Sequence, residues 1–76
     1  MQINDIYELY IYIANSGIDF KTIFYKLDPI YKEEVLNYIE FLKKKPTREQ
    51  FNSYKISNEA MQYFLSFVKS LIDKLN

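Results

Sequence analysis

Apolar residues recur along most of this chain at spacings of three and four, which is the pattern of helices that bury one face. Between residues 29 and 45, helical geometry separates an apolar stripe from a polar one. The apolar stripe comprises Tyr31, Val35, Tyr38, Ile39 and Leu42, and the polar one Glu33, Asn37, Glu40 and Lys44. Residues 58–75 repeat the pattern, and those predicted to face the core are Met61, Phe64, Leu65, Val68, Leu71, Ile72 and Leu75. Both segments are therefore predicted to be amphipathic helices.

Residues that begin or stop helices mark the first half of the chain. Asn4 or Asp5 can cap a first helix, and Gly17 follows its end, where a left-handed backbone is favoured. Asp28-Pro29 predicts a new helix start, because proline suits the first helical position and keeps the preceding residue extended. Whether the helix before Pro29 is separate, or continues through a kink, is left open by the sequence.

Similar signals divide the second half of the chain. Pro46 ends the third predicted helix, and Thr47 and Gln50 have the spacing of a capping box. Ser57 can cap the last helix. With one Gly and two Pro in the chain, few turns are available for an all-β fold. We predict one all-α domain over residues 1–76, a bundle of four to five helices at about 4–15, 20–27, 29–45, 48–54 and 58–75.

The first predicted helix is apolar on almost every side. Only Glu8 interrupts the apolar residues between Ile6 and Ala14. A domain this small buries only about 60% of its unfolded surface, so no helix lies easily at its centre. One interpretation is that this helix meets a partner or a second copy of the chain. The other is that its tyrosine rings are buried while their hydroxyls stay in water.

Three further aromatic residues fall outside the predicted core stripes. Phe41 lies on the polar side of its helix, so it is either covered by another element or exposed. Tyr63 and Phe67 lie four residues apart at the polar margin of the last helix, where they can touch each other. Aromatic side chains are enriched in interfaces. The predicted partner-binding residues are Tyr7, Tyr10, Ile11, Phe41, Tyr63 and Phe67.

The composition argues against an enzyme or a metalloprotein. The chain has no Cys and no His, which removes the usual thiol nucleophile, general base and zinc ligands. Its single Gly excludes the glycine-rich phosphate-binding loops. The carboxylates Asp28, Glu33, Glu34 and Glu40 lack the spacing of a calcium loop and are typical of a solvated helix face. We expect no catalytic residues, no metal and no cofactor.

Residues Thr47–Leu65 resemble a repressor-type helix-turn-helix, with a capped short helix, a turn and a second helix opened by Ile56-Ser57. The resemblance implies a DNA-binding regulator that uses this segment. The second helix carries Glu59 and no Lys or Arg in its first two turns, so it offers no cations to phosphates.

A basic cluster precedes this segment. It consists of Lys43, Lys44, Lys45 and Arg48. Under the DNA-binding alternative these residues grip a phosphate backbone. Lysines at a helix C-terminus also complement the helix dipole without any ligand. The chain carries ten basic and ten acidic residues, so no net charge draws it to nucleic acid.

Two features bear on where the protein works. Its longest apolar run, Leu9–Ala14, is far below a membrane span, and residues 1–10 lack the basic start of a secretory signal. We therefore expect a cytoplasmic protein without membrane contact or a small-molecule substrate. Residues with AT-rich codons abound, which indicates a low-GC genome. The leading hypothesis is a non-enzymatic adaptor or inhibitor that binds another protein, plausibly a phage or mobile-element product that modulates a host system, and possibly a homodimer.

Overall fold

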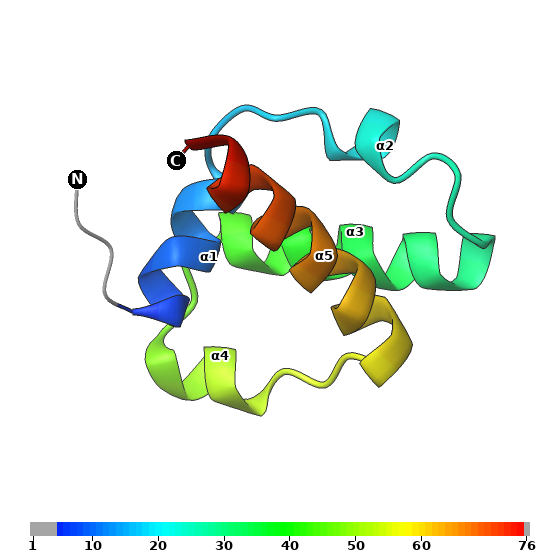
Figure 1. Ribbon diagram of the computed structural model, residues 1–76. Helices are drawn as coiled ribbons and strands as arrows, with labels where there is room; N and C mark the ends of the chain where they lie inside the picture. The colour runs from blue at the N-terminus through cyan, green and yellow to red at the C-terminus, as the bar shows by residue number, and fades with distance from the viewer. Residues whose placement is uncertain (1–4, 76) are drawn as a thin grey trace.

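The structure is a computed structural model that describes residues 5–75 except for the side chain of Leu75, which was predicted to face the core. Over this range the chain forms helices and no strand (Figure 1). The helices are α1 (Ile6–Ala14), α2 (Phe20–Ile23), α3 (Pro29–Lys43), α4 (Arg48–Ser53) and α5 (Asn58–Leu75). The predicted all-α fold is confirmed, and α2 is separate from α3.

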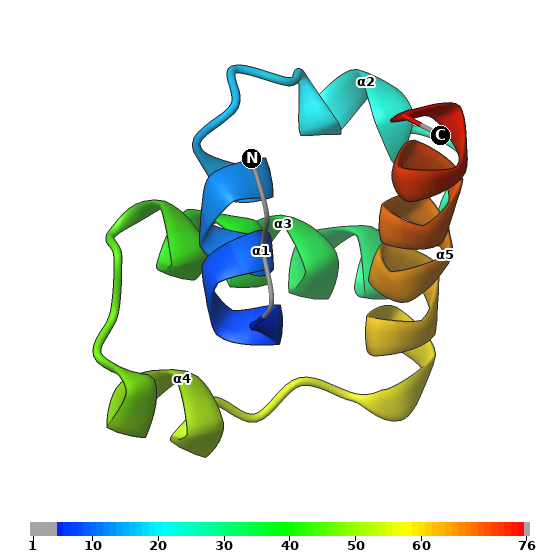
Figure 2. The same cartoon turned by 60° about the vertical axis from the view of Figure 1, so that its left-hand side comes forward.

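Helix α3 runs through the middle of the fold, and both α1 and α5 pack on it (Figure 1 and Figure 2). In both views α2 lies on one side of these three helices and α4 on the opposite side. Tyr10 of α1 meets Phe64 of α5 edge to face, with ring centroids 5.0 Å apart. This contact joins α1 and α5, the two helices that pack on α3.

The predicted helix signals act as expected where local chemistry decides them. The Asp5 carboxylate accepts a hydrogen bond from the Tyr7 N–H at 3.0 Å and caps α1. Asn4, the alternative cap, lies outside the described residues. Gly17 adopts a φ of +83° after α1 ends. The capping box of α4 is complete, because the side chains and backbone N–H groups of Thr47 and Gln50 bond reciprocally.

Helix α2 is shorter than predicted, ending at Ile23 instead of residue 27. Asp28 is extended, with a ψ of 136°, as the following proline requires. The chain must therefore leave the helix before Asp28, and it turns at residues 24–26, where the Leu27 N–H bonds the Phe24 carbonyl at 3.1 Å. This turn reverses the chain direction between α2 and α3.

Helix α3 ends two residues before the predicted Lys45, at Lys43. Lys45 adopts a φ of +53°, and its N–H bonds the Leu42 carbonyl at 3.0 Å. The left-handed residue turns the chain toward α1, where the Tyr7 hydroxyl donates to the carbonyl of the buried Pro46. A lysine thus occupies a conformation that usually favours glycine.

The core is built mainly from α1, α3 and α5. Its centre includes Val35, Leu42, Ala60 and Phe64, which have no exposed surface. On α3, the predicted apolar stripe is buried except for Tyr31, which is half-buried, and the predicted polar stripe is exposed. The interpretation of α3 from its periodicity is therefore confirmed.

Helix α5 is rotated relative to the prediction. Leu65 and Ile72, expected in the core, are 42% and 38% exposed. Phe67, expected at the polar margin, instead packs edge to face on Phe20 and Phe24, with centroids 5.7 and 5.6 Å apart. The apolar stripe of α5 is wider than the face that packs on the core. Phe20 and Phe24 cover the edge of the stripe on which Phe67 lies. The opposite edge is left in solvent.

Glu34 joins α3 to the start of α5, a role that the sequence did not indicate. Its Oε2 accepts a hydrogen bond from the Ser57 N–H at 3.0 Å, while the Ser57 hydroxyl accepts one from Ala60 N–H at 3.3 Å. The expectation that Glu34 belongs to a solvated face is wrong, because the carboxylate orients the cap of α5.

Candidate interaction groove

The predicted partner-binding residues of α1 make most of their contacts inside the fold. Tyr10 is only 7% exposed, and Ile11 packs against the core. The Tyr7 ring meets Phe51 edge to face at 5.3 Å. These side chains leave little surface for a partner, because Phe51 of α4 and Phe64 of α5 cover the two tyrosines. The outward apolar residues of α1 are instead Ile6 and Tyr12, which are 61% and 54% exposed.

The other three predicted residues lie apart from one another. Phe41 is covered by Tyr54, on which its ring stacks at 4.3 Å. Phe67 lies under α2, as described above. Tyr63 is 40% exposed and contacts Tyr31 of α3, at 5.7 Å between centroids, and no ring contact joins it to Phe67 among the described residues. The structure therefore does not gather the six predicted residues into one surface.

The predicted basic cluster is divided between several partners. Arg48 forms ion pairs with Asp5 and with Glu8, and its guanidinium lies 4.6 Å from the centre of the Tyr7 ring. Hydrogen bonds from Arg48 and from the Tyr7 backbone hold the pKa of Asp5 below its usual value. Lys43 pairs with Glu40 at 3.1 Å. The Arg48 contacts tie α4 to α1, whereas the Lys43 pair lies within α3, and together they engage two of the four cations.

Lys44 and Lys45, the other members of the cluster, border a small hollow of about 510 Å³ beside the stacked rings of Phe41 and Tyr54. The segment that resembles a helix-turn-helix is present as α4, a loop and α5. Glu59 is exposed in the first turn of α5, where a reading helix would meet DNA.

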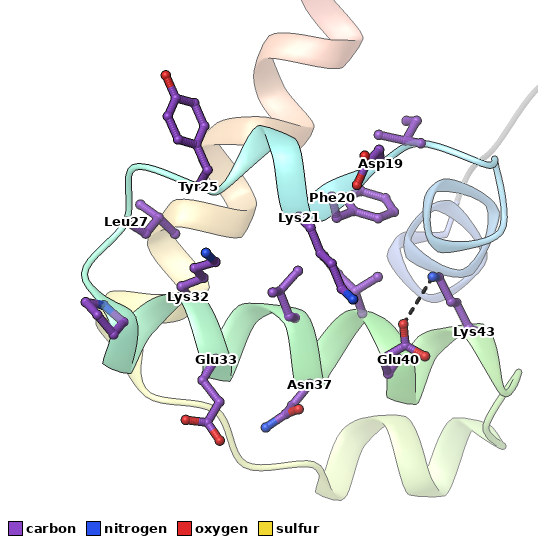
Figure 3. A pocket seen from close by; sticks show the side chains of 14 residues that line it. Asp19, Phe20, Lys21, Tyr25, Leu27, Lys32, Glu33, Asn37, Glu40 and Lys43 are labelled. Atoms are coloured by element: carbon purple, nitrogen blue, oxygen red, sulfur yellow. Dashed lines mark hydrogen bonds and ion pairs between the residues drawn. The ribbon is translucent and has the colours of Figure 1, made fainter.

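A larger groove, of about 910 Å³, lies between residues 18–27 and α3 (Figure 3). Its apolar lining comprises Ile18, Phe20, Leu27, Leu36 and Ile39, with Pro29 and Tyr25 at one end. The α2 wall is fixed by the packing of Phe20 and Phe24 on Phe67 of α5. Tyr25 is 60% exposed at the rim, and its ring points away from α3 (Figure 3). The groove is thus an open hollow with an apolar lining and a defined wall.

Charged side chains surround this apolar lining. Lys21 extends from α2 toward α3, and Lys32 extends from α3 toward the 20–27 segment (Figure 3). Glu33 and Asn37 point to the other side of α3. Lys43, from the predicted basic cluster, lies at the far end in its pair with Glu40. The groove therefore combines apolar surface with lysines reaching in from both walls.

None of the predicted partner-binding residues lines this groove. One signal for it was present in the sequence: Phe20, Phe24 and Leu27 share a helical spacing, while Lys21 and Tyr25 lie four apart on the other side. That pattern predicts an amphipathic segment with an exposed tyrosine. It does not predict which helix packs opposite, and so it does not reveal a hollow.

Two further findings concern the part of the chain that the structure describes. Residues 5–75 contain no group of three or more acidic, histidine or cysteine side chains placed to hold a metal ion. No helix in this range has the length and apolar character needed to cross a bilayer.

Comparison of the chain with protein-family models, with curated proteins and with solved structures yields no match.

Proposed function

We propose that this protein is a non-enzymatic binding domain that holds a segment of another protein in the groove between residues 18–27 and α3. The observation that carries the proposal is the open apolar lining of that groove. Concave apolar surfaces with a few polar groups at the edge are characteristic of binding sites.

The exposed apolar residues favour this groove over α1. Tyr25, which is 60% exposed, lines this groove, and Ile23, which is 42% exposed, lies two residues away in the same segment. On α1, Ile6 and Tyr12 lie six residues apart, and neither lines a hollow of this size. Single exposed apolar residues are common on proteins without a partner.

A pull-down from the source cells tests this function. The bait is the tagged chain, compared with Tyr25→Glu in the groove and Tyr12→Glu on α1 as a matched control. We expect a stoichiometric protein that survives nuclease treatment, is retained by Tyr12→Glu and is lost with Tyr25→Glu. Loss with Tyr12→Glu alone would transfer the interface to α1. Recovery of untagged copies of the same chain would replace a foreign partner with a homodimer.

We propose a cytoplasmic host protein as the partner, as expected of a modulator encoded by a phage or mobile element. The support for this setting is the low-GC coding pattern, which accompanies many such genes. The identity of the retained protein in the pull-down tests it directly, because a phage modulator would retain a component of a host system.

Nucleic-acid binding is the second candidate function, and one observation favours it. The stacked rings of Phe41 and Tyr54 border a hollow together with Lys44 and Lys45. Aromatic rings beside free cations are a common surface for single-stranded nucleic acid. Labelled single- and double-stranded DNA at low salt tests this. Binding that falls steeply with salt and is lost in Lys44→Ala/Lys45→Ala would support it, while no binding at low salt would remove it.

A further inference from the structure

Two lysines reach into the groove without an ion-pair partner among the described residues. Lys21 enters from α2, and Lys32 enters from α3 on the opposite wall (Figure 3). Lys32 is only half-exposed, with Leu36 one turn further along its helix. An ammonium group beside apolar side chains loses part of its hydration, so an anion that supplies hydrogen bonds there is favoured.

The acidic residues of the groove are already engaged or point away. Asp19 caps α2 and accepts a hydrogen bond from the Thr22 hydroxyl at 2.8 Å, which helps hold the pKa of this carboxyl below its usual value. Glu40 is paired with Lys43, and Glu33 points to the other side of α3 (Figure 3). Asp19 keeps its negative charge, but with Glu40 paired and Glu33 directed away it faces two lysines, so the net charge in the groove is positive although its lining has equal numbers of basic and acidic residues.

We infer that the groove selects an acidic amphipathic segment, in which Asp or Glu side chains are flanked by Leu, Ile or Phe. The apolar lining takes the hydrophobic side chains, and Lys21 and Lys32, which lie apart along the groove, each bind a carboxylate of the segment. This inference rests on the proposed function and adds the chemistry of the partner. A lipid or a nucleic acid would also bring negative charge, but only a peptide offers single carboxylates spaced between apolar side chains.

Selection of binders from a random dodecapeptide display library, with the full chain as target, tests this chemistry. The selected peptides are synthesised with a fluorescent label and titrated by anisotropy at low and high salt. We expect peptides rich in Asp or Glu beside Leu, Ile or Phe. We also expect affinity to fall about tenfold or more in Lys21→Gln/Lys32→Gln, and by less than about twofold in Lys44→Gln/Lys45→Gln, which removes the same charge outside the groove.

The outcomes separate this inference from the proposed function. Peptides that lack acidic residues, or that bind Lys21→Gln/Lys32→Gln as well as the wild type, would overturn the inference. If these peptides nevertheless bind the Leu36→Asn variant more weakly than the wild type, binding in the groove stands and only the selection for negative charge is wrong. If no peptide is enriched, or none responds to Leu36→Asn, both fail. Circular dichroism and thermal melting of each variant confirm that it is folded before its affinity is used.

Discussion

Phe67 is the contact that holds the α2 wall of the groove in place, so its removal is expected to release that wall. The ring packs edge to face on both Phe20 and Phe24. Helix α2 has four residues and is too short to form without such packing. Phe67→Ala should therefore open residues 20–27 locally before the rest of the fold responds.

The magnitude follows from the contacts of the ring. A fully buried Phe→Ala change costs about 3–5 kcal/mol, and each edge-to-face pair adds about 0.5–1.5 kcal/mol to simple burial. Phe67 is half-buried, so we expect the α2 segment to lose about 2–3 kcal/mol of protection against opening. A 76-residue domain typically has about 4–11 kcal/mol of stability, so the variant stays folded.

Amide hydrogen exchange followed by NMR measures this effect residue by residue. The reporters are the amides of Phe24 and Leu27, which bond to Phe20 and Phe24 within the segment. Their exchange should accelerate about 30- to 150-fold in Phe67→Ala, while α3 amides change much less. Tyr63→Ala, four residues earlier and 40% exposed, is the control and should leave α2 nearly unchanged. Equal acceleration in α2 and α3, or none in α2, would refute the reasoning.

Three further predictions concern the stability of the fold. Lys45→Gly should stabilise the protein by about 0.5–1 kcal/mol in urea unfolding, because glycine adopts the left-handed backbone at φ +53° without steric strain. The control Lys44→Gly, at φ −79°, should destabilise the protein. Glu34→Ala should lower the stability by about 1–3 kcal/mol in the same assay, because the part-buried Ser57 N–H loses its acceptor. The control Glu33→Ala, at an exposed position, should change stability by less than about 0.5 kcal/mol. Burial raises the pKa of Tyr38 to about 12 from 10.0, so the stability that its neutral form provides is complete below pH 10.0 and is lost as the pH rises toward 12. Tyr38→Phe should flatten that alkaline decline, and an unchanged decline would show that another group causes it.

The helix boundaries were largely predictable because short-range chemistry sets them. Asp5 and Thr47 cap helices through groups two or three residues away, and Gly17 supplies a conformation that its own backbone permits. The exceptions arise where a distant contact decides. Lys45 takes a left-handed turn although it is not glycine, and that turn brings Pro46 to Tyr7 of α1.

The candidate site was much less predictable, because it depends on which faces meet. The apolar stripe of α5 is wide enough to pack in two orientations, and the position of Phe20 and Phe24 selects the one that buries Phe67. The same packing leaves Leu65 exposed and creates the α2 wall of the groove. Periodicity identifies apolar faces within one helix, but it does not report the partner of each face.

Photo-crosslinking in the source cells tests the central claim, that the groove holds a protein partner, most directly. A photoreactive benzoyl-phenylalanine replaces either Tyr25 at the groove rim or Tyr12 on α1, which are 60% and 54% exposed and so tolerate the change equally. We predict a discrete crosslink to another protein from position 25 and none from position 12. A crosslink from position 12 without one from position 25, or a product joining only two copies of this chain, would contradict it.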